Sequence, residues 1–470
     1  MTNTTRREHD FLGDMEIPAA AYWGVHSARA VDNFPISGQT VAQMPELIRA
    51  LAFVKKAAAQ ANANLGVITT TQMTAIVHAC DDLIGGALHD QFVVDVIQGG
   101  AGTSTNMNAN EVIANLALEH MGFEKGRYDV LHPNDHVNAS QSTNDVYPTA
   151  LRVAAWFGIE GLLAAMADLR GAFEAKALEF KNVLKIGRTQ LQDAVPMTLG
   201  QEFLAFAIMI GEDEARLREA RARITEINLG ATAIGTGINA PLGYGEMVIP
   251  LLATASGVPV VKAENLVEAT QDTGSFVQLS GVLKRVACKL SKVCNDLRLL
   301  SSGPQAGFSD IRLPARQAGS SIMPGKVNPV IPEVMNQVAF EVIGNDVTIT
   351  MASEAGQLQL NAFEPIMGYA IHKSVRHLTN ACRTLQVNCI EGIQANHELL
   401  AKRVAESVTL VTALNPIIGY EKAALIAKTA LATGGTIAQV AESLGIMSQA
   451  EMNALLVPEK LTQPVRLAAR

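Results

Sequence analysis

Apolar residues recur every three or four positions over long stretches of this chain, a spacing typical of helices with one buried face. In the clearest stretch, residues 276–300, the apolar positions lie alternately three and four residues apart: Phe276, Leu279, Leu283, Val286, Leu290, Val293, Leu297 and Leu300. This heptad spacing predicts one long helix whose apolar seam packs against partner helices in a bundle. Further helical periods are found at residues 45–64 and 70–87, before residue 120, at 148–180 and 196–227, and beyond 334.

Polar segments interrupt this pattern at four places, residues 99–106, 132–147, 187–193 and 317–333, each close to a predicted helix start. Helix N-termini carry unpaired N–H groups and a partial positive charge, and therefore attract anions. Four such segments brought together would suit a small ligand with two carboxylates. Lys326 supplies one cation for it, and Arg188 or Arg29 is a candidate for another.

The segment 317–333 carries the most chemistry. Its two glycines and three prolines exclude a continuous helix, because glycine is permissive and proline fixes φ and lacks a donor. Within it lie Ser320, Ser321, Lys326 and Asn328. Pro329 suits the first turn of the helix that follows.

Composition limits the partners and the compartment. The chain has 470 residues, 48% of them apolar and only 5% aromatic, which favours packed helices. Its formal net charge is −8 without a Lys/Arg-rich block, so neither nucleic acid nor an anionic membrane is an expected partner. The five cysteines show no Cys-x-x-Cys spacing, and no secretory signal or membrane-spanning stretch is evident. We therefore expect a soluble, cytoplasmic protein.

The residue pattern contains no metal quartet, phosphate loop, Ser-His-Asp order or cofactor lysine. His132 and His136 are four residues apart, but Pro133 breaks the helix that would align them on zinc. The chemistry must then use hydrogen bonds, charge and one modest base. Removal of a proton next to a carboxylate fits, because fixed donors stabilise the resulting oxyanion by on the order of 3 kcal/mol each. Ser320 is the candidate base if Lys326 and loop N–H groups hold it as an alkoxide.

The segment GSSIMPGKVNP, residues 319–329, resembles the hallmark of the aspartase/fumarase superfamily, and the resemblance extends from YWGVHSARA at 22–30 to the C-terminal region. It implies an all-α fold of three domains, residues 1–142, 143–397 and 398–470. The long helices of the central domain would form a twenty-helix core in a homotetramer. Each active site would take residues from three subunits.

The resemblance also implies roles for single residues. The catalytic base would be Ser320, and Ser321 would help to hold the substrate β-carboxylate. The α-carboxylate would be bound by Lys326, Asn328 and Thr189. The group that holds the β-carboxylate and the amino group would consist of Thr103, Ser142, Thr143 and Asn144. Gln190 would also contact the amino group.

Sequence details favour the ammonia-lyase branch over the fumarase branch. Fumarases usually have Gly-Ala-Gln-Thr where this chain has residues 24–27, Gly-Val-His-Ser, and His where it has Gln190. The implied activity is reversible deamination of L-aspartate to fumarate and ammonia by a carbon–nitrogen lyase, through an aci-carboxylate. No organic cofactor or resident metal is expected, and activation by a divalent cation is left open. The alternatives are a class II fumarate hydratase and a catalytically silent structural or binding member.

The segment His132-Pro133-Asn134-Asp135 resembles a second anion site of fumarases, so His132, Asn134 and Asp135, with Arg29, are candidate substrate or activator contacts. If activation occurs there, His132→Ala should change activation and leave turnover at saturating substrate unaltered. Steady-state rates with and without activator check this; unchanged activation would remove the idea.

Overall fold

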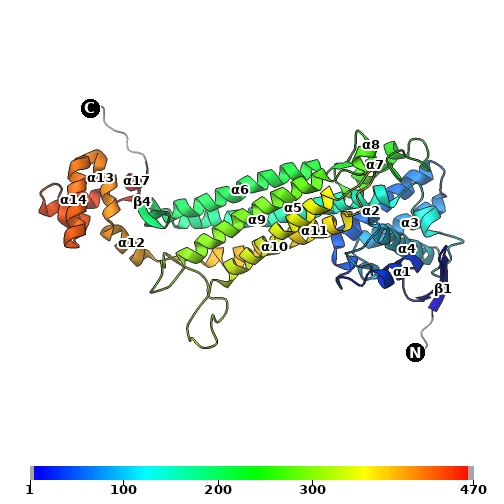
Figure 1. Ribbon diagram of the computed structural model, residues 1–470, viewed down its shortest axis with the longest axis horizontal. Helices are drawn as coiled ribbons and strands as arrows, with labels where there is room; N and C mark the ends of the chain where they lie inside the picture. Colours follow the sequence, from blue (N-terminus) through cyan, green and yellow to red (C-terminus); the bar gives the residue numbers. More distant parts are fainter. Residues whose placement is uncertain (1–4, 464–470) are drawn as a thin grey trace. The chain divides into compact units, whose positions relative to one another are not determined.

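The computed structural model describes residues 5–463, in which long helices predominate (Figure 1). The chain divides into two compact units. One contains residues up to Leu163, Ala215–Arg285 and Phe340–Leu378, and the other contains Ala164–Glu214, Val286–Ala339 and the residues from Thr379 onward. The finer division into three domains stays a prediction.

The predicted seam is the buried face of one long helix, α9, and its residues are at most 5% exposed. Polar contacts join this helix to α10: Asn336 Nδ2 donates to Ser291 Oγ at 2.8 Å, and Ser280 Oγ donates to Asp346 Oδ1 at 2.8 Å. The helix bundle expected from the sequence is therefore confirmed. The longest helices are α5 (Thr143–Glu179), α6 (Leu199–Arg223), α9 (Gly274–Leu300), α10 (Val330–Glu354) and α11 (Glu364–Asn388).

Helix α5 begins five residues earlier than predicted, so Pro148 lies inside it. A proline in this position leaves the carbonyl four residues before it without a helical donor. Asn228 Nδ2 supplies that donor, bonding the Asn144 carbonyl at 3.0 Å. The Asn228 side chain thus satisfies the carbonyl that Pro148 leaves without a helical partner, and α5 can begin at Thr143.

The first unit places small elements around helices α2 and α4. A buried carboxylate organises the start of α1, because Glu111 accepts hydrogen bonds from the N–H groups of Gly24, His26 and Ser27 and from Ser27 Oγ. The elements are β1 (Thr5–Asp10), β2 (Gly13–Pro18), α1 (Val25–Asn33), α2 (Pro45–Asn64), α3 (Thr70–Ile84), α4 (Thr103–His120), β5 (Glu226–Ile227), α7 (Tyr244–Ser256), β6 (Val261–Lys262) and α8 (Leu266–Ala269), with short turns at Val41–Gln43, His89–Gln91 and Pro133–Val137.

The second unit combines short helices with a β-hairpin. Ile186 of the hairpin is buried in one apolar cluster with Val404, Leu410 and Leu414. The elements are β3 (Leu184–Thr189), β4 (Gln192–Thr198), β7 (Ile311–Arg312), β8 (Gln394–Ala395), α12 (His397–Glu406), α13 (Val411–Ile418), α14 (Tyr420–Thr433), α15 (Ile437–Ser443), α16 (Gln449–Leu455) and α17 (Pro458–Leu461), with turns at Ile390–Gly392 and Val408–Leu410.

The structure adds short strands to the predicted helices, and the fold class remains all-α. In the described part of the chain they form four two-stranded sheets, β1–β2, β3–β4, β5–β6 and β7–β8. Pro196 was expected to open a helix, but it lies in β4, and α6 begins at Leu199. The helical multi-domain fold predicted from the sequence is confirmed.

Among the described helices, α5 alone has the length and apolar composition needed to cross a membrane. However, 56% of its most apolar window is buried within the protein, as in the core helix of a soluble bundle. All five cysteines are free thiols, and only Cys288 is exposed.

Gly24 has no room for a side chain, because a Cβ there would lie 2.4 Å from Glu8 Oε2 and 3.0 Å from the Glu111 carboxyl group. We expect Gly24→Ala to lower the unfolding free energy by about 1–3 kcal/mol through overpacking. Gly281→Ala in α9 is the matched control, because its Cβ would meet nothing within 4 Å. Thermal melting of both variants checks this; equal melting temperatures would contradict it.

Candidate functional site

The first two polar segments meet at two helix starts in the first unit. Thr103 is the first residue of α4, and Thr143 is the first residue of α5. Asn106 Nδ2, one turn into α4, donates to Thr143 Oγ1 at 3.2 Å. Gly102 before α4 has φ +89°, and a Cβ on it would lie 2.4 Å from the Tyr147 ring. The absence of a side chain there lets the two helix starts approach each other.

The start of α5 is capped by its own polar residues. Ser142 Oγ accepts from the Asn144 N–H at 3.2 Å, and the Ser142 N–H donates to Asp145 Oδ1 at 2.9 Å. This reciprocal pair resembles a capping box and fixes the first turn. Asn144 Nδ2 donates to the Ala233 carbonyl at 2.7 Å, which ties the turn to a second segment.

Asp145 lies under this helix start and has no exposed surface. Its other oxygen, Oδ2, accepts from the N–H groups of Gly230 and Thr232, each at 3.0 Å. Burial raises the pKa of Asp145 to about 6, while the three backbone N–H donors and Lys55 work in the opposite direction. The carboxylate therefore holds α5 and the segment 230–232 in one arrangement.

Lys55 is a fully buried cation in the same unit. Its ammonium donates to Asn138 Oδ1 at 2.8 Å, and that oxygen also accepts from Asn106 and Asn110. Burial lowers the pKa of Lys55 to about 7, partly opposed by the charge of Asp145. Lys55 and Asn138 thus form a buried polar network with Asn106 of α4, and Asp145 at the start of α5 lies close enough for its charge to act on Lys55.

The sequence interpretation did not single out these three residues. Two features of the sequence indicate Asp145 and Lys55. Asp145 stands three residues after Ser142, the spacing of a helix cap, and Lys55 lies on the apolar stripe of α2 with Leu51 and Ala58. A lysine on an apolar face indicates a buried polar network, because its charge must be paired.

In the second unit, Thr189 and Gln190 lie at a hairpin turn, not directly before a helix as predicted. Thr189 pairs with Gln192, so Gln190 and Leu191 form a two-residue loop. Both have positive φ, +54° and +62°. This is the conformation of a type I′ turn, which is strained for residues other than glycine or asparagine. Thr189 and Gln190 thus lie on an exposed tip.

Most of the segment 317–333 lies in the long loop between β7 and α10, and its residues from Val330 onward form the first turn of α10 (Figure 1). Ser320 Oγ accepts from the backbone N–H groups of Ile322 at 3.1 Å and Met323 at 3.0 Å. Two aligned donors favour the negatively charged form of an oxygen. The loop thus places two main-chain N–H donors on the oxygen of the predicted base.

The neck of this loop is closed by hydrogen bonds. The Gly319 N–H donates to the Lys326 carbonyl at 2.8 Å, and Asn328 Nδ2 donates to the Gly319 carbonyl at 2.8 Å. A Cβ on Gly319 would lie 2.7 Å from the Lys326 carbonyl oxygen, so the neck requires glycine. Residues 315–318, Ser320 and residues 323–327 line a hollow of about 440 Å³. Ser320 and Lys326 thus line one concave surface.

The candidate cations differ in how they are paired. The guanidinium of Arg29 binds Asp10 through two bonds of 2.8 Å, and that of Arg188 binds Asp310 at 2.7 Å. For the Lys326 ammonium, no hydrogen-bond or ion-pair partner is found in residues 5–463. Of these three cations, Lys326 is therefore the one available to a ligand.

The residues at 132–135 are bonded within their own turn. His132 Nδ1 accepts from the N–H groups of Asn134 at 3.1 Å and Asp135 at 3.3 Å. The two N–H groups that would meet an anion are thus held by the His132 ring. In the described part of the chain no group of three or more His, Cys, Asp or Glu side chains is placed to hold a metal ion.

This helical architecture is that of a lyase. A lyase family profile matches residues 13–344, and a fumarase C C-terminus profile matches residues 410–463. The chain belongs to this lyase family, within the aspartase/fumarase superfamily predicted from the segment 319–329.

Its curated relatives include aspartate ammonia-lyases. That of Pseudomonas fluorescens is 56% identical and is aligned over 98% of this chain and 96% of its own length. The Escherichia coli K12 enzyme of the same name is 52% identical over 100% of this chain and 98% of its own length.

Solved structures agree with the fold. A cobalt-bound fumarate lyase:delta crystallin from Brucella melitensis superposes with a TM-score of 0.95 at 57% identity, over 98% of this chain and 100% of that one. A class II fumarase from Schistosoma mansoni gives 0.90 at 33% identity, over 97% and 99%.

The pKa of Asp145 generates a pH prediction. The pKa of Asp145 is about 6 in the folded state and 3.8 in the unfolded state, so the protonated side chain stabilises the folded state below pH 3.8. This contribution to the unfolding free energy is lost as the pH rises through 6. The loss is roughly 3 kcal/mol. Asp145→Asn lacks this titration, so the melting-temperature advantage of the wild type over the variant should narrow with rising pH. Melting both proteins across this range tests it; a constant or widening gap would show that Asp145 is ionised throughout.

Proposed function

We propose that this chain catalyses the reversible deamination of L-aspartate to fumarate and ammonia, as an aspartate ammonia-lyase. The observation that carries the proposal is the 52–57% identity to curated aspartate ammonia-lyases over nearly the whole chain. The arrangement around Ser320 supplies a physical route to that chemistry.

In this mechanism Ser320 removes a proton from Cβ of L-aspartate. A free serine hydroxyl is too weak a base for this step, and the N–H groups of Ile322 and Met323 offset that weakness by stabilising the alkoxide. Proton removal places a second negative charge on the β-carboxylate, giving the aci-carboxylate. Loss of ammonia from Cα then forms the double bond of fumarate.

The substrate is held by the dispersed polar segments. Lys326, Asn328 and Thr189 bind the α-carboxylate, and Ser321 with Thr103, Ser142 and Thr143 binds the β-carboxylate. Asn144 and Gln190 contact the amino group. The start of α5 suits the β-carboxylate because the hydroxyls of Ser142 and Thr143 lie at a helix N-terminus whose first turn Asp145 fixes. Asn328 would have to release the Gly319 carbonyl or bind while bonded to it.

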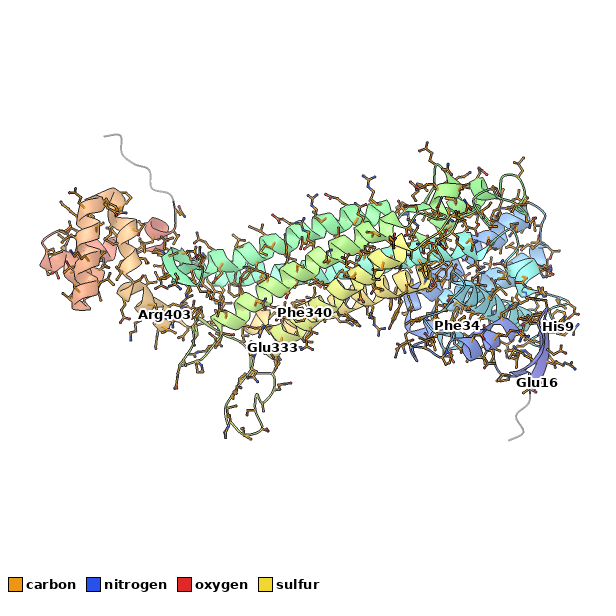
Figure 2. All side chains as sticks on the ribbon, in the orientation of Figure 1. His9, Glu16, Phe34, Glu333, Phe340 and Arg403 are labelled. Atoms are coloured by element: carbon orange, nitrogen blue, oxygen red, sulfur yellow. The ribbon has the colours of Figure 1, made fainter. Side chains whose placement is uncertain are left out.

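We further propose that the enzyme is a cytoplasmic homotetramer whose active sites combine residues from three subunits. The exposed face of α10 supports association: Phe340, Val347 and Met351 are 64%, 56% and 66% exposed, and Phe340 is labelled in Figure 2. Apolar side chains spaced by seven and four residues on one helix face suit a partner helix. No organic cofactor is needed, and a divalent cation would act as an activator.

Incubation with L-aspartate should give the ultraviolet absorbance of fumarate. We expect Ser320→Ala to lower turnover by about 10³-fold or more, because no neighbouring group replaces the base. Light scattering and melting should show that the variant retains the assembly of the wild type. Ser309→Ala, a serine outside the loop, is the control.

The alternatives give different results in the same assays. Conversion of malate with no reaction of L-aspartate would identify a fumarate hydratase. Absence of both reactions in an intact assembly would identify a catalytically silent member. Retention of turnover by Ser320→Ala would remove this serine from the role of base.

A further inference from the structure

Asp310 is a fully buried carboxylate surrounded by three cations in the second unit. Arg188 Nη1 donates to Oδ2 at 2.7 Å, Arg403 Nη1 donates to Oδ1 at 2.6 Å, and Lys185 Nζ lies 3.3 Å from Oδ2. Lys185 also binds Glu202 at 2.6 Å. Charge-assisted bonds of this kind are strong and directional, so Asp310 determines where each cation lies.

These contacts join segments that are far apart in the sequence. Lys185 and Arg188 belong to β3 of the hairpin, and Arg403, labelled in Figure 2, belongs to α12. The Asp310 N–H donates to the Leu300 carbonyl at the end of α9, and its carbonyl accepts from the Asn396 N–H. Asp310 therefore holds strand β3 of the hairpin, from Lys185 to Arg188 beside the turn, on the segment that leads into the Ser320 loop.

The hairpin tip depends on this support. Arg188 directly precedes Thr189, and its guanidinium lies 4.2 Å from the centroid of the Phe308 ring. Gln190 and Leu191 keep strained, positive φ angles at the turn. Such strain persists only when the surrounding structure fixes it, and it is common at ligand-binding sites. Weaker anchoring of Arg188 would let the turn relax.

We propose that Asp310 is a positioning residue for the substrate: by anchoring Arg188 it keeps Thr189 and Gln190 where they bind L-aspartate. This inference rests on the proposed function, because it concerns binding of that substrate. Arg188 then acts through the hairpin and not as a direct partner of a substrate carboxylate. The loss of this anchor should weaken binding more than it slows the chemical step at Ser320.

The test compares Asp310→Asn with Glu202→Gln in the full-length enzyme. Asp310→Asn keeps the shape and removes the charge, so KM for L-aspartate should rise ~10-fold or more while kcat falls less than ~3-fold. Glu202→Gln removes another carboxylate of the same cluster. Glu202 binds Lys185 and not Arg188, so the KM of this variant for L-aspartate should stay within about twofold of the wild-type value. Equal effects of the two variants, or a fall in kcat alone, would overturn the proposal.

Arg188→Gln provides an independent test. The Arg188 side chain is 15% exposed, and its replacement removes only one of the three cations around Asp310. It should raise KM as Asp310→Asn does, and the double variant should be no worse than the more affected single variant. A wild-type KM for Arg188→Gln, or multiplied effects in the double variant, would overturn the proposal even if Asp310→Asn fails to fold. A wild-type enzyme that does not convert L-aspartate would instead overturn the proposed function.

Discussion

Buried carboxylates that accept several donors at once determine how the polar segments of this protein are arranged. Glu111 accepts from the N–H groups of Gly24, His26 and Ser27, Asp145 accepts from those of Ser142, Gly230 and Thr232, and Asp310 is paired with three cations. An unpaired charge in the interior costs several kcal/mol, so each carboxylate is stable only when its donors converge on it. Segments that are far apart in the sequence are held together in this way.

Much of the fold could be predicted because helix periodicity is a local property. The seam of α9 and the bounds of α2 follow from the spacing of apolar residues, and the structure has both. The start of α5 was missed because Asn228, whose side chain compensates Pro148, lies 84 residues from Asn144 in sequence. The hairpin turn was missed because Gln190 and Leu191 lack the glycine or asparagine that usually marks such a turn.

The candidate site was only partly predictable for the same reason. The grouping of hydroxyls and amides near helix starts is visible in the sequence, and Ser320 stands out in its loop. The sequence cannot show which cations are already paired within the fold. Lys326 was expected to supply one cation and Arg188 or Arg29 a second, but Asp10 and Asp310 are already paired with the two guanidinium groups. Pairing depends on tertiary contacts, as does the burial of Lys55.

The donors to Ser320 Oγ come from the main chain of its own loop. No side-chain replacement at positions 322 or 323, other than proline, removes those N–H groups. The two donors to Ser320 Oγ are therefore insensitive to most amino-acid substitutions, whereas the proposed contacts with the substrate are side chains, such as those of Lys326 and Thr189, which a single substitution removes. Substitution of those side chains can therefore change the ligand preference while the two main-chain hydrogen bonds to Ser320 stay in place.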